Sequence, residues 1–285
     1  MARSLMFLGT ASSVGKSTMA AAFCRILRQE GFRVAPFKAQ NMSAKAVELE
    51  GGLRISVVQA VQAQAAGVAP RVEMNPVLLI PRSELRSEVF VNGRSLGEMA
   101  WQEYTADPHA VALQAVRRAV ARLTAEFEVI VAEGAGSPVE VNLRDRDLAN
   151  MTAAELLDAD VLLVADIDRG GVFASVVGTL ELLQPQERAR VKGLVINRFR
   201  GDPSLFADGV RWLEQRTGLP VVGVIPYLPD LGLDEEDSAG LTDPNAPAPS
   251  AAARESALDR LADHVRRHAR TGMVLEWLNR DRSRL

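Results

Sequence analysis

Short apolar runs alternate with longer amphipathic segments along most of the chain, and these segments predict strands and helices. Several runs are almost entirely apolar, which is typical of parallel strands buried on both faces. The expected strands are Leu5–Gly9, Val34–Lys38, Val129–Glu133, Val161–Asp166, Gly193–Asn197 and Val221–Ile225. The expected helices are Lys16–Gln29, Val57–Ala66, Ala110–Glu126, Ala153–Leu157, Ala174–Leu183 and Ser204–Arg216. This alternation predicts a doubly wound α/β fold with a mostly parallel sheet, whose ligands bind beyond the carboxyl ends of the strands.

The pattern changes near the end of the sequence. An acidic run, Asp234–Asp237, precedes a segment rich in proline and alanine at Leu241–Ala253, which is typical of a linker. Beyond it, Ser256–Asn279 has apolar residues at helical spacing and predicts one final helix with a solvated outer face. We therefore expect a main domain at residues 1–241, a linker at 242–253 and a helical tail at 254–285.

Composition and charge exclude several classes of partner. With 285 residues, of which 47% are hydrophobic, the chain is long enough to bury a large core. The net charge of −3 provides no basic surface for nucleic acid. The single cysteine, Cys24, allows no intramolecular disulfide, and no apolar run approaches the roughly 20 residues that span a bilayer. We expect a cytoplasmic protein that binds neither nucleic acid nor membrane.

The segment Gly9–Ser17 carries the strongest functional signal. It reads GTASSVGKS between an expected strand and an expected helix, where backbone N–H groups cradle phosphate oxygens. Lys16 adds a positive charge near the β- and γ-phosphates and Ser17 a hydroxyl for Mg²⁺, so ATP and Mg²⁺ are the expected cofactors. The long spacing between its glycines is similar to that of dethiobiotin synthetase-like P-loop proteins, and a chance glycine-rich turn is the alternative. The expected nucleotide contacts here are Thr10, Ser12, Ser13, Val14, Gly15, Lys16, Ser17 and Thr18.

Polar residues follow two further expected strands. Glu133 ends one strand and precedes glycines that permit close approach, so it is a candidate Mg²⁺ ligand, direct or through another group. A plain glycine turn is the alternative there. Lys38 ends another strand and could hold a phosphate or a substrate carboxylate. Gln40, Asn41 and Ser43 follow it with neutral donors and acceptors, although an ordinary polar loop would have the same composition.

Three later segments carry charged or amide side chains. After Asn142 and Leu143, residues 144–147 alternate arginine and aspartate, which indicates either substrate orientation or an exposed ladder of ion pairs. Asp166 and Arg169 precede two glycines that open a helix, and this corner is suited to anions. Asn197 and Arg198 follow the fifth strand, where P-loop folds of this type often place an asparagine against the base.

Taken in order, these motifs resemble those of the synthetase domain of cobyric acid synthase, the glutamine-dependent amidase of cobalamin biosynthesis. The resemblance covers about Leu8 to Leu241. Its marks are GTASSVGKS, APFKAQNMS, QAVQAQAAG, MNPVLL, EGAGSPVEVNLRDRDLANM, ADIDRGGVFAS and VINRFRGD. FKAQNMS and NLRDRDLANM make the chain more similar to this family than to the sister cobyrinic acid a,c-diamide synthases.

The resemblance implies ATP-dependent amidation of corrinoid side-chain carboxylates through an acyl phosphate, on a substrate of the adenosylcobyrinic acid a,c-diamide type. It implies that Ser17 and Glu133 bind the metal and that Asn197 and Arg198 contact the nucleotide. The implied catalytic residues are Lys16, Lys38, Glu133, Asp145 and Asp147. The implied substrate-binding residues are Lys38, Gln40, Asn41, Ser43, Asn142, Arg144, Asp166 and Arg169.

The chain departs from this family in its source of ammonia. Family members usually continue into a glutamine amidotransferase domain, whereas Cys24 lies in helical register with apolar residues and predicts a packed core thiol. None of His109, His264 and His268 has the context of a catalytic base for it. We therefore expect ammonia from solution or from a separate glutaminase subunit. Related enzymes of this fold often form homodimers, and the segment LDRLADHVRRH resembles the family's closing helix, which points to an internal loss of the glutaminase domain.

Two smaller departures leave alternatives open. Ile80 stands where the family usually has a cation, and Leu53–Val58 replaces an acidic stretch that contains glycine. The alternatives are a related ligase for another carboxylate, and an ATP-binding partner of a separate glutaminase that has lost catalysis. Corrinoid binding separates the first alternative from the main interpretation, and substrate-stimulated ATP hydrolysis separates the second.

Overall fold

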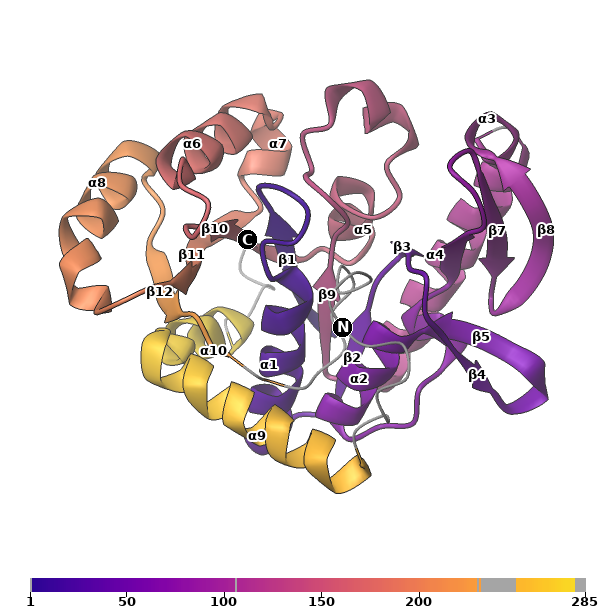
Figure 1. The fold of residues 1–285 in the computed structure, drawn as a ribbon, viewed down its shortest axis with the longest axis horizontal. Helices are drawn as coiled ribbons and strands as arrows, with labels where there is room; N and C mark the ends of the chain where they lie inside the picture. The colour runs from indigo at the N-terminus through magenta and orange to yellow at the C-terminus, as the bar shows by residue number, and fades with distance from the viewer. Residues whose placement is uncertain (1, 106, 230, 232–249, 280–285) are drawn as a thin grey trace.

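The computed structural model describes residues 2–105, 107–229, 231 and 250–279, and its centre is a six-stranded sheet (Figure 1). The strands are β1 (Arg3–Gly9), β2 (Val34–Phe37), β9 (Val129–Glu133), β10 (Asp160–Asp166), β11 (Val191–Phe199) and β12 (Val221–Pro226). All neighbouring strands are parallel, in the order β12-β11-β10-β1-β9-β2. The predicted doubly wound parallel sheet is confirmed, and the six expected strands are present with small shifts at their ends.

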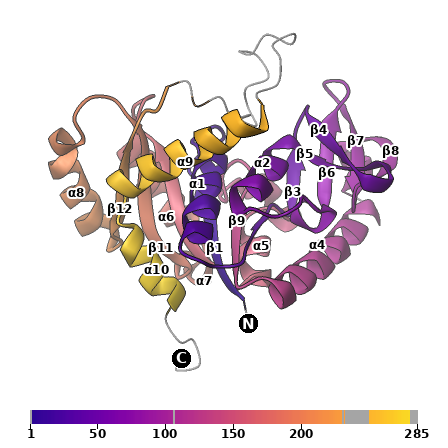
Figure 2. The same cartoon turned by 90° about the horizontal axis from the view of Figure 1, so that it is seen from below.

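The sheet sends alternate side chains into two apolar cores. In β1, Met6 and Leu8 pack in one core and Phe7 in the other, because successive residues of a strand point to opposite faces. The first face is covered by α4 (Asp107–Glu126), α5 (Met151–Leu156), α6 (Val172–Leu182) and α8 (Ala207–Thr217). The second is covered by α1 (Lys16–Gln29), α2 (Val57–Ala66), α9 (Ala251–His268) and α10 (Thr271–Asn279) (Figure 2). Cys24 is buried in the second core, as predicted, and burial raises the pKa of its thiol.

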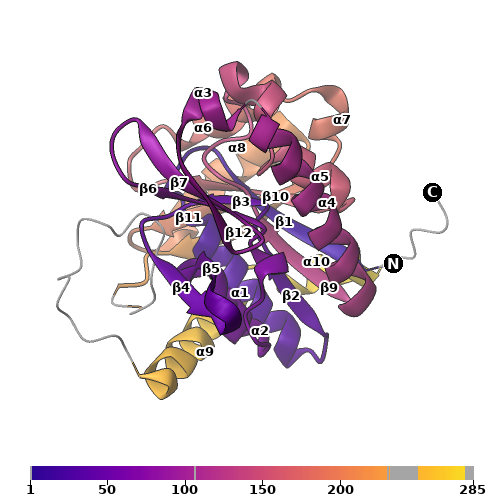
Figure 3. The ribbon, with the colours of Figure 1, turned by 90° about the vertical axis from the view of Figure 1, so that its right-hand side faces the viewer.

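A smaller sheet, which the sequence patterns did not predict, continues the chain after β2 (Figure 3). It consists of β3 (Gln40–Met42), β6 (Val77–Pro81), β7 (Arg86–Val91) and β8 (Arg94–Ala100). A hairpin of β4 (Ala46–Leu49) and β5 (Leu53–Ser56) and the short helix α3 (Trp101–Tyr104) accompany it. Most of β8 is exposed, so its sequence has the composition of a polar connection rather than of a buried strand.

The remaining helical elements are short and lie in the connections. They are α7 (Pro185–Arg188), η1 (Glu50–Gly52), η2 (Val72–Met74), η3 (Val141–Arg146) and η4 (Pro203–Phe206). In the part of the chain that the structure describes, no helix combines the length and the apolar character needed to cross a bilayer.

The C-terminal segment forms two helices, so the single helix expected over Ser256–Asn279 was wrong. Helix α9 ends where Ala269 becomes extended and forms a bridge to Gly223 of β12, which redirects the chain into α10. Helix α9 also begins at Ala251, inside the expected linker. The acidic run and the linker residues before position 250 lie outside the described residues.

Helix α9 is held against α1 by a buried arginine. Nη2 of Arg25 is 2.6 Å from Glu255 Oε2, and its Nε is 2.7 Å from Asp259 Oδ1. The hydrogen bond from Arg25 lowers the pKa of the Asp259 carboxyl group. Because α1 follows the Gly9–Ser17 segment directly, this ion pair supports the helix that carries the strongest motif of the sequence.

Candidate active site

The Gly9–Ser17 segment forms a tight loop between β1 and α1. Gly15 has φ of 97°, in the left-handed region that glycine adopts without strain. A Cβ atom at this position would also lie 2.1 Å from Nδ2 of Asn197, which is closer than any non-bonded contact. Asn197 Nδ2 donates a hydrogen bond to Val14 O at 2.9 Å and so joins β11 to the loop. Both the backbone and the neighbouring strand therefore require glycine here.

The other residues predicted to contact the nucleotide are spread around this loop. Thr10 donates its backbone N–H to Val164 O of β10 at 2.9 Å. Ser12 and Ser13 face a cavity beside the loop. Thr18 lies in the first turn of α1. Their contacts with a nucleotide remain predictions.

Lys16 begins α1, and its side chain is almost completely buried. Its Nζ donates to Ala11 O and to Gly136 O, both at 2.9 Å, so it joins this loop to the loop that follows β9. A lysine ammonium is a compact point charge that can exchange carbonyl partners for phosphate oxygens. The position therefore suits the phosphate contact expected from the motif.

Glu133, at the end of β9, is the centre of a buried polar cluster. Ser17 Oγ donates to Glu133 Oε2 at 2.6 Å. Gln59 and Gln62 of α2 donate to Glu133 Oε1 at 2.8 and 2.9 Å. Lys38 Nζ lies 3.9 Å from the same Oε1, and both side chains of this ion pair are fully buried. The cluster joins the end of β9, the start of α1 and the helix α2.

Ser17 and Glu133 present two oxygen-bearing groups that suit Mg²⁺. In nucleotide sites Mg²⁺ is held by few protein oxygens and completes its octahedron with water and phosphate oxygens. Among the described residues, no group of three or more histidine, cysteine, aspartate or glutamate side chains could hold a metal ion. The donor set therefore fits Mg²⁺ bound together with a nucleotide, and the two predicted ligands are in direct contact.

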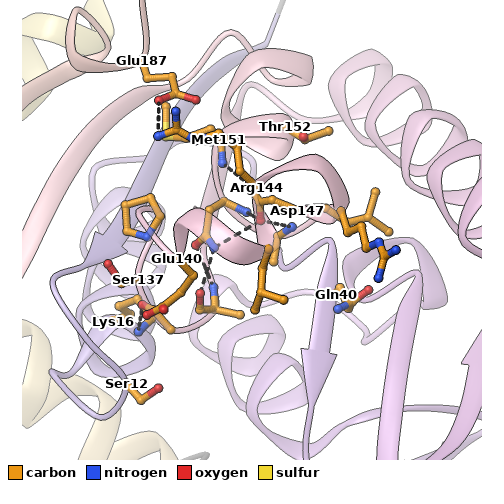
Figure 4. A pocket seen from close by; sticks show the side chains of 18 of the residues that line it. Ser12, Lys16, Gln40, Ser137, Glu140, Arg144, Asp147, Met151, Thr152 and Glu187 are labelled. Carbon is orange, nitrogen blue, oxygen red and sulfur yellow. Dashed lines mark hydrogen bonds and ion pairs between the residues drawn. The ribbon is translucent and has the colours of Figure 1, made fainter. Parts of the chain in front are cut away.

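A cavity of about 820 Å³ opens beside the Gly9–Ser17 loop, which we call the phosphate loop (Figure 4). Its lining comes from the phosphate loop, from the chain between β9 and α5, from the smaller sheet and from α7. Representative lining residues are Ser12, Ser13, Lys16, Ser137, Glu140, Arg144, Asp147, Thr152, Gln40, Met42, Trp101 and Glu187. The cavity thus has Lys16 in its wall, and the rest of the wall combines polar and apolar side chains.

Asp147 shapes this wall by ordering the start of α5. Its Oδ1 accepts hydrogen bonds from the backbone N–H groups of Ala149 and Asn150 at 3.1 and 2.9 Å, and its Oδ2 accepts from Met151 at 2.8 Å. Burial raises the pKa of Asp147, and these N–H donors oppose that shift. With its oxygens bonded to backbone donors, Asp147 has a structural role in this geometry, and its expected catalytic role stays a prediction.

The expected residues around Asp147 do not all reach the cavity. Arg144 lines the cavity, and its Nη2 donates a hydrogen bond to Leu182 O at 2.9 Å. The same Nη2 lies 3.6 Å from Glu187 Oε2. Asn142 and Asp145 lie on the exposed helix η3 and are absent from the cavity wall. The catalytic role expected of Asp145 and the substrate contact expected of Asn142 therefore stay predictions.

The FKAQNMS segment divides between the cavity and the protein interior. Gln40 lines the cavity and accepts a hydrogen bond from Tyr104 Oη at 2.6 Å. Asn41 is buried behind it, and Ser43 is buried and donates to the backbone of the next loop. Lys38 pairs with Glu133 below the cavity. Of the four expected substrate contacts, Gln40 is the one with a side chain on the cavity wall.

Four further predicted site residues lie at the ends of β10 and β11 and are absent from the cavity wall. Asp166 ends β10 and Arg169 follows it, whereas Asn197 and Arg198 lie near the end of β11. Arg198 Nη1 is 3.1 Å from Asp166 Oδ2. The structure therefore places Asp166 beside Arg198, one of the expected nucleotide contacts, and the substrate contacts expected of Asp166 and Arg169 stay predictions. Asn197 uses its amide nitrogen for the phosphate loop, and its contact with adenine remains a prediction.

The two departures from the family pattern lie away from the cavity. Ile80 packs with Leu78 and Phe90 in a small apolar cluster of the second sheet. The Leu53–Val58 segment forms β5 and the start of α2. Neither the side chain of Ile80 nor this segment lines the 820 Å³ cavity, so these changes leave its wall intact.

The sequence reasoning missed three residues that the structure brings to the site. Gln59 and Gln62 contact Glu133, and Trp101 lines the cavity. A signal for the glutamines was present, because QAVQAQAAG places two amides three residues apart on one helical face. Trp101 follows a strand that was itself not predicted, so nothing in its local sequence indicated its position.

Comparisons with known proteins are consistent with this geometry. A family model described as a CobQ/CobB/MinD/ParA nucleotide binding domain matches residues 5–239. The chain is 53% identical over 241 residues to the probable cobyric acid synthase of Methanothermobacter thermautotrophicus, covering 85% of this chain and 48% of that protein. It is 54% identical over 242 residues to the cobyric acid synthase of Desulforamulus reducens, covering 85% and 47%. For that of Acaryochloris marina the identity is 49% over 279 residues, covering 96% and 56%.

The chain thus spans about half the length of the curated relatives it matches. The matched part contains the phosphate loop, Glu133 and the cavity wall between β9 and α5. The family model covers most of the chain and agrees with the parallel sheet order and the loop between β1 and α1. The chain belongs to the CobQ/CobB/MinD/ParA nucleotide-binding domain family.

Proposed function

We propose that this chain is an ATP-dependent amide-forming ligase that activates side-chain carboxylates of a corrinoid. The observation that carries the proposal is the contact of Ser17 with Glu133, 2.6 Å long, beside a phosphate-loop lysine that faces an 820 Å³ cavity. The relatives with about half of their residues identical are cobyric acid synthases, and this supports the choice of substrate class.

The reaction follows from the chemistry of a carboxylate, which is a poor electrophile toward ammonia. A carboxylate oxygen attacks the γ-phosphorus of ATP, the bond to the β-phosphate oxygen breaks, and ADP leaves. Ammonia then attacks the carbonyl carbon of the acyl phosphate, phosphate leaves, and the nitrogen loses a proton to give the amide. The protein supplies position and charge neutralisation for the first step.

The phosphate corner, which consists of Lys16, Ser17, Lys38 and Glu133, provides these functions. Loop N–H groups and Lys16 hold the phosphate oxygens. Ser17 and Glu133 would hold Mg²⁺, which when bound neutralises charge on the β- and γ-phosphates. Lys38 places a positive charge 3.9 Å from Oε1 of the buried Glu133 carboxylate.

The cavity wall supplies the contacts for the corrinoid. A corrinoid is a large macrocycle with an apolar body and several carboxylate or amide arms. Arg144 and Gln40 offer donors for those arms, and Met42 and Trp101 offer apolar surface for the body. Ammonia comes from outside the nucleotide-binding domain, because Cys24 is buried in its core and is inaccessible as a nucleophile.

The test combines ATP hydrolysis with product mass. The protein is incubated with ATP, Mg²⁺ and ammonium, with and without adenosylcobyrinic acid a,c-diamide. We expect corrinoid-stimulated release of ADP, together with stepwise conversion of carboxylates to amides in the mass spectrum. ATP binding without corrinoid-stimulated turnover would contradict the proposal and would favour another carboxylate or a partner role without catalysis.

A further inference from the structure

Helix α2 carries two glutamines that the reaction has not yet used. Gln59 and Gln62 are fully buried, lie one helical turn apart, and both donate from Nε2 to Glu133 Oε1. We propose that they are positioning residues, which hold the Glu133 carboxylate so that its Oε2 is presented to Ser17 and to Mg²⁺. This rests on the proposed function, because it takes Ser17 and Glu133 as the metal ligands.

Two hydrogen bonds of Ser56 hold the start of α2 in place, and this fixes the position of the two glutamine amides relative to Glu133. Ser56 Oγ accepts a hydrogen bond from Val58 N–H at 3.2 Å, which caps the helix. The Ser56 N–H donates to Asn75 Oδ1 at 3.0 Å. Residues three apart on a helix lie on one face, so a helix fixed at its start presents both glutamines to Glu133 together.

Amide donors suit this role because they orient a carboxylate without cancelling its charge. The Lys38 ammonium already lies 3.9 Å from Glu133 Oε1. Two neutral N–H donors occupy the lone pairs of that same oxygen, and Oε2 keeps its capacity for Ser17 and a cation. Groups that orient a metal ligand in this way tune its affinity for the metal.

Two buried amide oxygens that lack a hydrogen-bond partner among the described residues indicate that these amide groups are oriented to direct their nitrogens toward the Glu133 network. In the described part of the chain, Gln62 Oε1 and Asn41 Oδ1 are buried without a hydrogen-bond partner. A buried carbonyl left in this way destabilises the protein, because it has lost its hydrogen bonds to water without replacing them. Turning the Gln62 amide around would instead direct its oxygen at the Glu133 carboxylate, so the observed orientation preserves the contact with Glu133.

The same network reaches the substrate side of the cavity. Asn41 Nδ2 donates to Gln59 Oε1 at 2.8 Å, and Gln59 in turn donates to Glu133. Asn41 belongs to β3, as does Gln40 on the cavity wall. A displacement of β3 by the substrate would therefore be transmitted to the carboxylate through Gln59.

The test replaces each glutamine by methionine, which has similar length and no donor. Gln59→Met and Gln62→Met are compared with Gln64→Met on the same helix, since Gln64 donates to Glu255 and not to Glu133. Mn²⁺ binding in the presence of a non-hydrolysable ATP analogue is followed by electron paramagnetic resonance. Affinity for the analogue in EDTA is measured separately and reports whether the phosphate loop remains folded.

We expect Mn²⁺ affinity to fall about 10- to 100-fold in Gln59→Met and Gln62→Met, with the metal-free affinity for the analogue unchanged. Gln64→Met should match the wild-type protein. If a methionine variant does not fold, Gln62→Asn tests the same donor, because it shortens the side chain by one methylene group and withdraws the amide from Glu133.

Wild-type Mn²⁺ affinity in folded Gln59→Met and Gln62→Met variants would overturn the positioning role. An equal loss in Gln64→Met would also overturn it, because the effect would then belong to the helix and not to the contact with Glu133. A wild-type protein that gains no affinity for the analogue from Mn²⁺ would overturn the metal site itself. Failure of the proposed function is distinguished by its own readout, since corrinoid amidation is not needed for these measurements.

Discussion

The phosphate corner and the rim of the cavity are constructed in opposite ways. In the corner, Lys16, Lys38 and Glu133 are almost completely buried and bonded to neighbouring groups. The rim is helix η3, where Val141 is 65% exposed and Leu143 39% exposed. A reacting phosphate needs charges held at fixed positions in a dry site, whereas a large ligand needs accessible surface. One cavity can therefore combine a rigid chemical end with an open recognition end.

The largest expected effect tests the burial of the corner. Lys38→Met removes one charge of a fully buried ion pair and leaves the Glu133 carboxylate without its counter-charge. We expect the free energy of unfolding to fall by about 3 kcal/mol or more. Urea unfolding measures this, with the exposed Lys45→Met as the control. Equal stability of the two variants would show that the corner does not depend on this pair.

The next effect tests the chemistry of the corner. Lys16→Ala removes the ammonium that joins the two loops and that we expect to contact the phosphates. Corrinoid-dependent ADP release should fall roughly 10²-fold, which corresponds to about 2.7 kcal/mol. Lys192→Ala, at an exposed position outside the site, provides the matched control. Full turnover in Lys16→Ala would exclude this loop as the site of phosphoryl transfer.

A smaller effect concerns the wall between the corner and the rim. Asp147→Ala removes an acceptor of three backbone N–H groups at the start of α5. The expected loss of stability is about 1–2 kcal/mol, as for a helix cap. Asp145→Ala, on the exposed rim, should change the stability by less than about 0.5 kcal/mol. Thermal unfolding compares the two, and a reversed order would contradict the structural role of Asp147.

The smallest effect concerns helix α9, which packs against α1. Nε2 of His264 in α9 lies 2.9 Å from Pro226 O at the end of β12. Burial lowers the pKa of His264 below 6.5. The hydrogen bond with Pro226 O opposes this shift of the pKa, and the neighbouring His268 and Arg267 add to it. The unfolded chain therefore binds the proton more readily, so this contribution to stability is present above pH 6.5 and is lost as the pH falls below it.

The measurement is the melting temperature between pH 5.5 and 7.5 for the wild-type protein and for His264→Gln. The wild-type melting temperature should decrease more steeply toward low pH, because the variant has no imidazole to protonate. Parallel curves would show that His264 does not titrate with a lowered pKa.

The sequence was sufficient for the main sheet because its strands face two cores. A strand such as β10 is apolar at nearly every position, and this pattern is hard to produce in any other way. The smaller sheet lacks that signal, since β8 has five exposed residues in succession. The break between α9 and α10 was also missed, because it depends on a bridge from Ala269 to Gly223 that is distant in sequence.

The parts of the candidate site that the sequence predicted are polar or charged residues that lie at or just after the end of an expected strand. Ser17 and Glu133 were placed together by the rule that the carboxyl ends of parallel strands share one edge. Gln59 and Gln62 were not assigned, because an uncharged amide on a helix is equally common at a surface. The contacts of Asp147 with the start of α5 were not predicted, since a carboxylate that caps a helix has the same local sequence as one that binds a ligand.

The contact between Gly15 and Asn197 has a consequence for the study of related sequences. A side chain at position 15 would collide with the amide that joins β11 to the loop, so the two positions are not free to vary independently. A relative that has lost glycine at position 15 must also have rebuilt the end of β11. The residues at positions 15 and 197 together therefore distinguish homologues that retain this loop geometry from homologues that have lost it. Their sequences alone are enough for this distinction.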